Sequence, residues 1–596
     1  MASSKWYRYR AQRISNAIRR PATLDGASGH GSQSLSVARR QTLSGVETGA
    51  ATAAKHQASN VTTSLRPADV RPAFQDLLGA SGRFTVAVEL ETSRGVTLGG
   101  RAKRVHEYAR RLSESGLADA FTLTDNPGGH PHLRPETLGR SLLELGSELV
   151  INVSCKDYNR NGLESRLWSL ASVGFHNILC LSGDYPSQGI GGGAKPVFDV
   201  DSAGLLEMVR RLNSGAGDAT GLVSPALGTV FYPGAVVNPF KQREGEYMTQ
   251  LFKLALKARV GARWFITQIG YDARKQDDLL RYMKANGLDQ PVLGTVFLLG
   301  PQSARHFSTW AIPGVYLSPE LLALAEKHAA SPDKGRQFFN ELAAKQVAVL
   351  RGLGYSGVHI SGRPDFDRVR DVLEIEKSFG TSDWKQFAKD IQYAQPDEFY
   401  YFERDDTTGL SATEVNRNYA RTRGRRAPLI RQAAMSPGYQ IGRVAHAVML
   451  SDKAPAAGAG RALLRATGKS KRLSKIGHLI EQAVKIPMYG CKDCGDCSLP
   501  ELAYLCPESQ CAKNQRNGPC GGTKAGRCEV LDKDCVWLRA YDRLKVTGQE
   551  ENMLDAAPVL CDASLRGTSS WANALLGRDH TAKRLAGEGA DVAPRP

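Results

Sequence analysis

The run R-F-T-V-A-V-E-L at residues 83–90 is typical of a strand that is buried on both faces, with a single carboxylate near its end. Seven similar runs of apolar and β-branched residues follow, at 119–124, 149–155, 177–181, 226–232, 263–268, 291–298 and 357–361. Stretches with helical periodicity separate them, at 101–115, 162–173, 205–212, 246–260 and 321–353. Eight strands that alternate with helices predict an α/β fold, a parallel (β/α)8 TIM barrel.

A doubly wound open sheet is the alternative architecture. Its usual mark is a GxGxxG turn between a strand and a helix, and none of the predicted strands is followed by one. The glycine-rich run at 189–193 follows a strand, but Pro186 precedes it and no helix begins on it. We interpret this run as a flexible loop, which favours the barrel.

The 596 residues exceed what one core usually holds, so the chain is expected to contain several domains. The pattern predicts a disordered basic leader at 1–75, the barrel at 76–375, an extension and basic helical linker at 376–480, a small Cys-rich metal-binding module at 481–580 and a tail at 581–596. An Arg-rich, acid-poor leader suits a mitochondrial transit peptide or a bacterial extension. The expected location is therefore cytoplasmic, or mitochondrial if the leader is a transit peptide.

The net charge of +18 raises the question of nucleic acid. Much of the excess lies in the first 24 residues and in 418–477, and no recognised nucleic-acid-binding motif accompanies either stretch. A solvated leader and linker explain the charge, so we expect no nucleic-acid partner. No apolar run approaches the ~18 residues that a membrane span needs, so we expect no membrane partner either.

Polar residues stand where the predicted strands end. They are Glu89, Thr124, Asp125, Asn126, Asn152, Asp157, Asp184, Asn238, Thr267 and Gln268. The carboxyl ends of barrel strands meet on one rim, where catalytic groups collect. A carboxylate at the end of an apolar strand is costly to bury unpaired, so several such groups on one rim predict a binding site.

The order and spacing of five motifs resemble the divergent branch of the methylenetetrahydrofolate reductase family. They are V-A-V-E-L at 86–90, L-S-G-D at 181–184, K-P-V-F-D-V-D-S at 195–202, V-G-A-R-W-F-I-T-Q at 260–268 and L-G-Y-S-G-V-H-I at 353–360. This resemblance covers residues 76–375. It implies a flavin-dependent oxidoreductase of one-carbon metabolism that interconverts 5,10-methylenetetrahydrofolate and 5-methyltetrahydrofolate by hydride transfer from flavin N5.

The resemblance also implies roles for individual residues. Glu89 would be the general acid, with a pKa raised by burial, and Asp184 would orient the pterin and stabilise its cation. The substrate would contact Gln268, Asn152 and Tyr271. The flavin would contact Thr124, Asp125, Asn126, Asp184 and Lys257.

The sequence departs from the family pattern at three places. Leu90-Glu91-Thr92-Ser93 replaces the usual Phe-Phe-Pro-Pro, Asn152 replaces a histidine, and Ser182 replaces an arginine. FMN therefore stays open beside FAD, and the electron donor is NAD(P)H or a protein. Two other functions stay open: methyltetrahydrofolate oxidation at the same site in one-carbon catabolism, and a non-catalytic electron-transfer or metal-binding scaffold. An oligomeric state is also open.

Eight of the eleven cysteines lie within 45 residues: Cys491, Cys494, Cys497, Cys506, Cys511, Cys520, Cys528 and Cys535. CxxC spacing lets one turn aim two thiolates at one metal, and eight thiolates make two four-ligand sites. The spacing allows [4Fe–4S] clusters or structural zinc. The strings R-N-G-P-C-G-G at 516–522 and G-T-S-S-W-A-N at 567–573 resemble the Cys-rich C-terminal domain found with this reductase in some bacteria, where it is thought to supply electrons.

Overall fold

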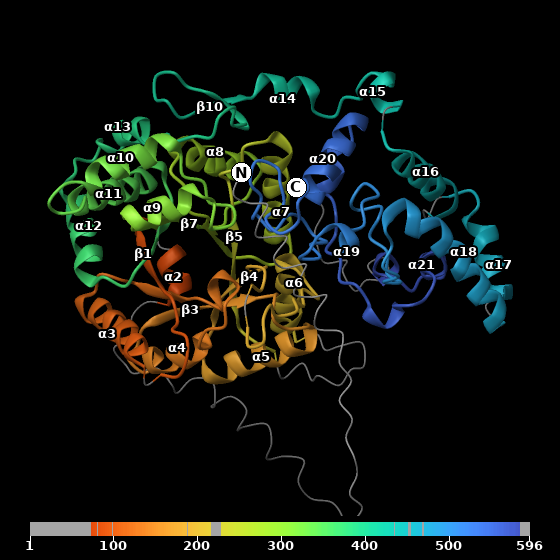
Figure 1. Cartoon of the computed structure of the whole chain (residues 1–596), viewed down its shortest axis with the longest axis horizontal. Coiled ribbons are helices and arrows are strands. Elements are labelled where there is room, and N and C mark those ends of the chain that lie inside the picture. The colour runs from red at the N-terminus through yellow and green to blue at the C-terminus, as the bar shows by residue number, and fades with distance from the viewer. Residues whose placement is uncertain are drawn as a thin grey trace, which may run out of the picture. The chain divides into compact units, whose positions relative to one another are not determined.

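Eight parallel strands close into a barrel in the order in which they occur along the chain, and helices surround it (Figure 1). The computed structural model describes residues 73–583 except 80–81, 98, 188, 216–227, 434, 451–453 and 468–469. The strands are β1 (Thr85–Leu90), β2 (Ala120–Leu123), β3 (Glu148–Ser154), β4 (Asn177–Leu181), β5 (Tyr232–Val237), β6 (Trp264–Thr267), β7 (Val292–Phe297) and β8 (Gly357–Ser361). The predicted TIM barrel is confirmed.

The strands bury both faces, as their near-continuous apolar runs require. One face packs against the surrounding helices, and the other fills the barrel with side chains such as Ala87, Val150 and Leu293. Phe74, on the short helix α2 (Phe74–Gly79), joins this inner cluster and contacts the Trp264 ring edge-on at 5.1 Å. The boundary predicted at 75/76 thus falls inside α2, and residues 1–72 lie outside the described part of the chain.

The predicted fifth strand was wrong. Among the described residues of the run 226–232, only Tyr232 belongs to β5, which continues through Pro233 and Gly234 to Val237. Proline and glycine normally interrupt strands, which is why the sequence favoured the preceding run. Here the Pro233 carbonyl accepts from the Arg263 amide, just before β6 begins. The pairing of β5 with β6 starts only at Gly234, so the N–H that proline lacks is not needed in that ladder. Gly234 is required because a Cβ would lie 2.2 Å from the Trp264 ring.

The helices around the barrel are α3 (Gly100–Ser115), α4 (Pro135–Leu143), α5 (Arg160–Val173), α6 (Ser202–Asn213), α7 (Glu244–Arg259), α8 (Ala273–Ala285), α9 (Pro301–Ser308), α10 (Pro319–Ala329), α11 (Arg336–Leu353) and α12 (Phe366–Ser378). The single helix predicted at 321–353 is wrong: α10 and α11 replace it. Pro332 lies in the break, and Lys334 and Gly335 adopt positive φ angles of 54° and 79° that no α-helix accommodates.

Behind the barrel come α13 (Trp384–Asp390), the antiparallel pair β9 (Phe402–Arg404) and β10 (Ser411–Val415), and short helices that lead into the Cys-rich region. They are α14 (Arg417–Thr422), α15 (Leu429–Ala433), α16 (Pro437–Ala445), the π-helix η3 (His446–Leu450), α17 (Ala457–Thr467) and α18 (Lys471–Tyr489). The Cys-rich region itself contains α19 (Pro507–Gln510), α20 (Val536–Thr547), α21 (Ser570–Leu575) and α22 (His580–Lys583). Within the described ranges, no helix combines the length and apolar content that crossing a bilayer requires.

Candidate functional site

Glu89 is the predicted acid, and it lies on the inner face of β1. It points to the same face as Ala87, which belongs to the inner cluster, whereas Val88 and Leu90 pack outward. Burial and, to a smaller extent, the nearby Glu91 carboxylate together raise the pKa of Glu89 to about 7. A carboxyl with this pKa is partly protonated near neutral pH and can donate a proton there.

A buried histidine, which the sequence interpretation missed, lies in the same barrel. His359 on β8 contacts Thr122 Oγ1 through Nε2 at 2.8 Å and Thr295 Oγ1 through Nδ1 at 3.3 Å. The Thr295 hydroxyl donates to the Thr267 carbonyl at 2.5 Å, so toward the imidazole it can only accept. Nδ1 therefore carries the proton, and Nε2 accepts from Thr122. Burial lowers the pKa of His359 to about 4, so the ring is neutral.

Two polar atoms on the inner face are buried and have no hydrogen-bond partner among the described residues. They are Asn152 Oδ1 on β3 and Ser361 Oγ at the end of β8. Both alternate with outward-packing residues, as Glu89 does. An unsatisfied buried polar atom costs about 1–3 kcal/mol, so these atoms favour a ligand with hydrogen-bonding edges.

The other two predicted substrate contacts lie after β6. Gln268 Oε1 accepts from the Ile269 amide at 2.9 Å. Tyr271 is 3% exposed, and its hydroxyl is a further buried atom without a partner in the described ranges. Its ring, however, belongs to a separate apolar cluster with Leu299 and Phe307. The structure therefore groups Glu89 and Asn152 on the inner face of the barrel, while Tyr271 is buried among apolar side chains.

The predicted flavin contacts after β2 are largely engaged within the protein. Asp125 Oδ2 accepts from Arg166 Nη1 at 2.8 Å and from the Ser154 hydroxyl at 2.8 Å. Burial opposes ionisation, but Arg166 and Ser154 hold the pKa of Asp125 below its usual range. Asn126 donates to Asp157, and the Thr124 amide donates to the Leu90 carbonyl at 3.2 Å. These residues shape the loop, and their flavin contact stays a prediction.

Asp184, predicted for both catalysis and flavin binding, joins two loops at the carboxyl end of the barrel. Its Oδ2 accepts from the Gly128 amide at 2.8 Å. The adjacent Gly129 has φ 71°, and a Cβ there would lie 2.2 Å from the Tyr185 carbonyl oxygen. Only glycine allows this approach, so the loops after β2 and β4 are held together beside Asp184.

Lys257 does not lie with this group. It extends from α7, and its Nζ donates to the Val236 carbonyl at 2.6 Å. Burial and the neighbouring Lys253 lower its pKa to about 7. Its other neighbours include Cys155 and Cys180, which pack in the outer layer between strands and helices. The structure thus places this lysine outside the inner face of the barrel.

Part of the Cys-rich region covers the ends of β4 and β5. Lys513 Nζ donates to the Gly183 carbonyl at 2.8 Å, and the Ser182 hydroxyl donates to Gln515 Oε1 at 2.9 Å. Asn238 Nδ2 donates to the Gly521 carbonyl at 2.9 Å. The segment 513–521 therefore binds directly to strand ends of the barrel, next to Asp184. No sequence pattern indicated these contacts.

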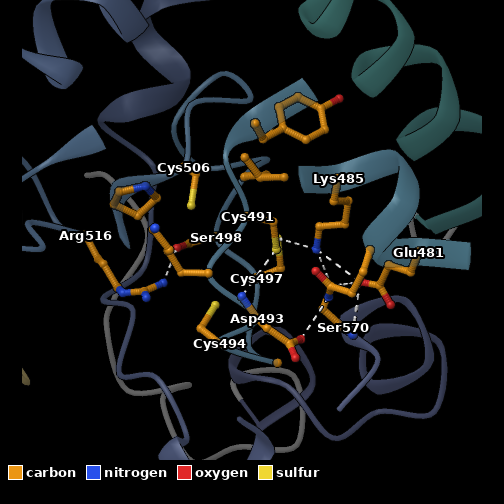
Figure 2. Close-up of a pocket in the computed structure, with 16 residues that line it drawn as sticks. Glu481, Lys485, Cys491, Asp493, Cys494, Cys497, Ser498, Cys506, Arg516 and Ser570 are labelled. Carbon is orange, nitrogen blue, oxygen red and sulfur yellow. Dashed lines mark hydrogen bonds and ion pairs between the residues drawn. The ribbon is translucent and has the colours of Figure 1, made fainter. Parts of the chain in front are cut away.

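Four of the predicted metal ligands line one cavity (Figure 2): Cys491, Cys494, Cys497 and Cys506. Two buried cations share it. Lys485 Nζ lies 3.5 Å from Cys497 Sγ, 3.1 Å from Glu481 and 2.6 Å from Ser570. Arg516 lies on the other side, 2.7 Å from Ser498 Oγ. Burial raises the pKa of the Cys497 thiol to about 11, although the Lys485 ammonium opposes this.

The other four predicted ligands form a second group of neighbouring thiols. Cys511 lies within electrostatic reach of Cys528, and Cys520 and Cys535 lie within reach of Cys511. Cys520 Sγ also contacts Glu529 Oε1 at 3.2 Å, which in turn pairs with Lys513 at 2.7 Å. In the described ranges, no three His, Cys, Asp or Glu side chains meet at the distances of a single bound metal ion.

The fold and site together define a (β/α)8 barrel with an uncompensated acid and unsatisfied polar atoms inside it, the class of barrel that binds a ligand at its strand ends. Residues 78–363 match the methylenetetrahydrofolate reductase family, and residues 471–561 match a family described as methylene-tetrahydrofolate reductase C terminal. Residues 78–363 therefore form a domain of the methylenetetrahydrofolate reductase family, and residues 471–561 form the C-terminal domain associated with it.

Individual relatives are distant. A probable methylenetetrahydrofolate reductase (NADPH) of Caenorhabditis elegans is 23% identical over 209 residues, which span 34% of this chain and 29% of that protein. A Clostridium thermocellum protein that binds two copies of 5-methyl-5,6,7,8-tetrahydrofolic acid is 16% identical, with a TM-score of 0.36 over 51% of this chain and 96% of its own. EDTA monooxygenase of Chelativorans sp. BNC1 is 14% identical, with a TM-score of 0.32 over 50% of this chain and 96% of its own.

Proposed function

We propose that the protein is a flavin-dependent methylenetetrahydrofolate reductase that interconverts 5,10-methylenetetrahydrofolate and 5-methyltetrahydrofolate. The observation that carries the proposal is the carboxyl of Glu89, half-buried on the inner face of a barrel of this family and desolvated enough that its pKa is raised to about 7. The reduction needs a group that gives a proton at neutral pH, and an ordinary exposed glutamate is already ionised there.

The proton has a defined task. The five-membered ring of the substrate must open to an iminium before hydride can reach its methylene carbon, and the leaving nitrogen then needs a proton. Glu89 would donate it. The iminium is cationic, and the neutral state of His359 keeps a positive charge away from it. Asp184, held by the Gly128 amide, would supply a compensating negative charge at the strand ends.

The inner face suits a planar polar ligand. Asn152 Oδ1 can accept a hydrogen bond and the Ser361 hydroxyl can donate or accept one, and both are buried without partners among the described residues. The edge of a flavin or pterin would satisfy them. A bound flavin would supply the hydride from N5. Thr124, Asp125 and Asn126 would help to hold it, although Asp125 is already paired with Arg166. Lys257 faces the outer layer, so a role in binding the flavin would require it to move.

We propose further that the two cysteine groups hold [4Fe–4S] clusters that supply electrons to the flavin. The first group lines one cavity with Lys485 and Arg516, whose charges would offset those of the thiolates and cluster. The second group includes Cys520, which is adjacent in sequence to the Gly521 contact with Asn238 on the barrel. Structural zinc is the alternative occupant, and it would make the region a clamp without redox activity.

The decisive experiment is an absorbance spectrum of anaerobically purified full-length protein, followed by titration with 5-methyltetrahydrofolate. A flavin band near ~450 nm that bleaches on titration is expected, because hydride would pass directly between folate and flavin. Protein that is colourless and takes up neither FAD nor FMN on reconstitution would contradict the proposal. If 5-methyltetrahydrofolate reduces the flavin more slowly than 5,10-methylenetetrahydrofolate reoxidises it, the reductive direction is favoured.

A further inference from the structure

A second cavity lies beside the barrel, between the loop that follows β1 and the first turns of α3 and α4. Its volume is about 350 Å³. Its lining side chains include Thr92, Ser93, Thr97, Lys103, His106 and Thr137. Glu89 and the other predicted site residues do not contribute to the lining. The cavity is therefore separate from the inner face of the barrel.

Two hydroxyls in this cavity have no partner. Thr92 is 1% exposed and Ser93 is 3% exposed, and neither side-chain oxygen forms a hydrogen bond with the described residues. A polar group buried in this way is normally satisfied by the protein or by something bound to it. Ser141, which also lines the cavity, differs, since its hydroxyl donates to the Leu138 carbonyl at 2.9 Å.

The charges around the cavity favour an anion. The first turns of α3 and α4 contribute Lys103 and Thr137 to its wall, and neither helix start has a side-chain cap, so the N-terminal amides of both helices lie uncapped near the cavity. Lys103 adds a cation that no ion pair with a described residue neutralises. The one lining carboxylate, Glu107, is paired with Arg110 at 2.7 Å. Glu91, nearby, is paired with Arg101 at 3.1 Å.

We propose that this cavity is a binding site for a carboxylate or phosphate group, with Thr92 and Ser93 as hydroxyl donors and Lys103 as the cation. The loop that forms it, Leu90 to Ser93, begins directly after Glu89 on β1. Two sources of such a group fit. One is the γ-glutamate tail of the folate that the proposed function assigns to the barrel, and the other is a separate phosphate-bearing metabolite.

The test measures binding by isothermal titration calorimetry, so it does not depend on turnover. Three probes are titrated into full-length protein: methyltetrahydrofolate triglutamate, its monoglutamate, and inorganic phosphate. One added charge-assisted contact should make the triglutamate form bind about tenfold more tightly than the monoglutamate form. This difference would assign the site to the folate tail. Phosphate binding without that difference assigns it to a separate metabolite. If neither of these two signals appears, the proposal is overturned. Because the binding of folate itself is also measured, failure of the proposed function is seen separately.

Variants make the assignment specific. Ser93→Ala and Lys103→Met should each weaken the responding probe about tenfold, as expected for one hydrogen bond to a charged group. Ser93→Ala removes a hydroxyl without a protein partner, so its melting temperature should not fall. Ser141→Ala, whose hydroxyl is already engaged, and Lys327→Met on α10 are the matched controls and should bind as the unmodified protein does. Equal affinity in all four variants would contradict the proposal.

Discussion

The two sides of the barrel's carboxyl end differ in how their polar groups are satisfied. On the β8–β1–β3 side, Glu89 has no compensating cation, and Asn152 Oδ1 and Ser361 Oγ have no partner in the described ranges. On the β4–β5 side, the segment 513–521 forms hydrogen bonds with strand-end groups of Ser182, Gly183 and Asn238. One side keeps buried polar atoms without protein partners in the described ranges, and the other side is covered by the protein's own chain.

The same contrast separates two carboxylates on neighbouring strand ends. Burial raises the pKa of Glu89, whereas Arg166 and Ser154 hold the pKa of Asp125 low despite its burial. An unpaired buried acid is a group that can transfer a proton, and a paired one is a structural anchor. The charge partner, and not the residue type or the depth of burial, distinguishes the two roles.

The largest expected effect comes from removing the unpaired acid. Glu89→Gln should lower the rate of folate-dependent flavin reoxidation by about 10²–10⁴-fold, the usual loss for a general acid. Flavin reduction by the electron donor should continue, because that half-reaction needs no proton on folate. Stopped-flow absorbance measures both half-reactions. Equal losses in the two would assign Glu89 a structural role and break the contrast with Asp125.

The covered side is tested through its cysteines. Cys494→Ser should remove one centre, so that iron falls from about eight to about four atoms per chain if both groups hold [4Fe–4S] clusters. Flavin reduction by the native donor should slow, while reduction by methyltetrahydrofolate should not change. Cys180→Ser, in the outer layer of the barrel and outside both groups, is the control. Two zinc ions and no iron in the unmodified, anaerobically purified protein would contradict the electron-supply role.

The stability of the covered side depends on Asn517. Its side chain donates to Asp201 at 3.0 Å and accepts from the Val559 amide, at 5% exposure. Asn517→Ala leaves these buried groups unpaired and should lower the free energy of unfolding by about 1–3 kcal/mol. Denaturant titration measures this, with the exposed Asn418→Ala as control. An unchanged midpoint would show that the contact between the segment 513–521 and the barrel adds no stability.

The smallest effect concerns the pH profile. Glu89 donates a proton only while protonated, so the folate half-reaction should slow as pH rises above about 7. Glu91→Gln removes the smaller of the two causes that raise this pKa, so the falling limb should move to lower pH by less than about one unit. Glu91→Asp keeps the charge and should leave the limb in place. A shift to higher pH would show that Glu91 acts otherwise than by repulsion.

Much of the fold was readable in the sequence because a barrel strand must be apolar on both faces and must end in polar residues. Seven of the eight strands were located in this way, and β8 has the predicted bounds 357–361. The fifth strand was misplaced, because Pro233 and Gly234 are tolerated only through tertiary contacts with the start of β6 and with Trp264. Local composition cannot show such contacts.

By itself the sequence determined the barrel, the position of Glu89 at a strand end, and the grouping of eight cysteines, since each follows from local pattern and spacing. Tertiary structure decided which polar residues have partners. It paired Asp125 with Arg166, turned Lys257 toward the outer layer, joined His359 to two threonines, and placed the segment 513–521 on β4 and β5. Partners arise from residues up to hundreds of positions apart, and the energy of a charge depends on them, so the chemistry of the site becomes visible only in the folded chain.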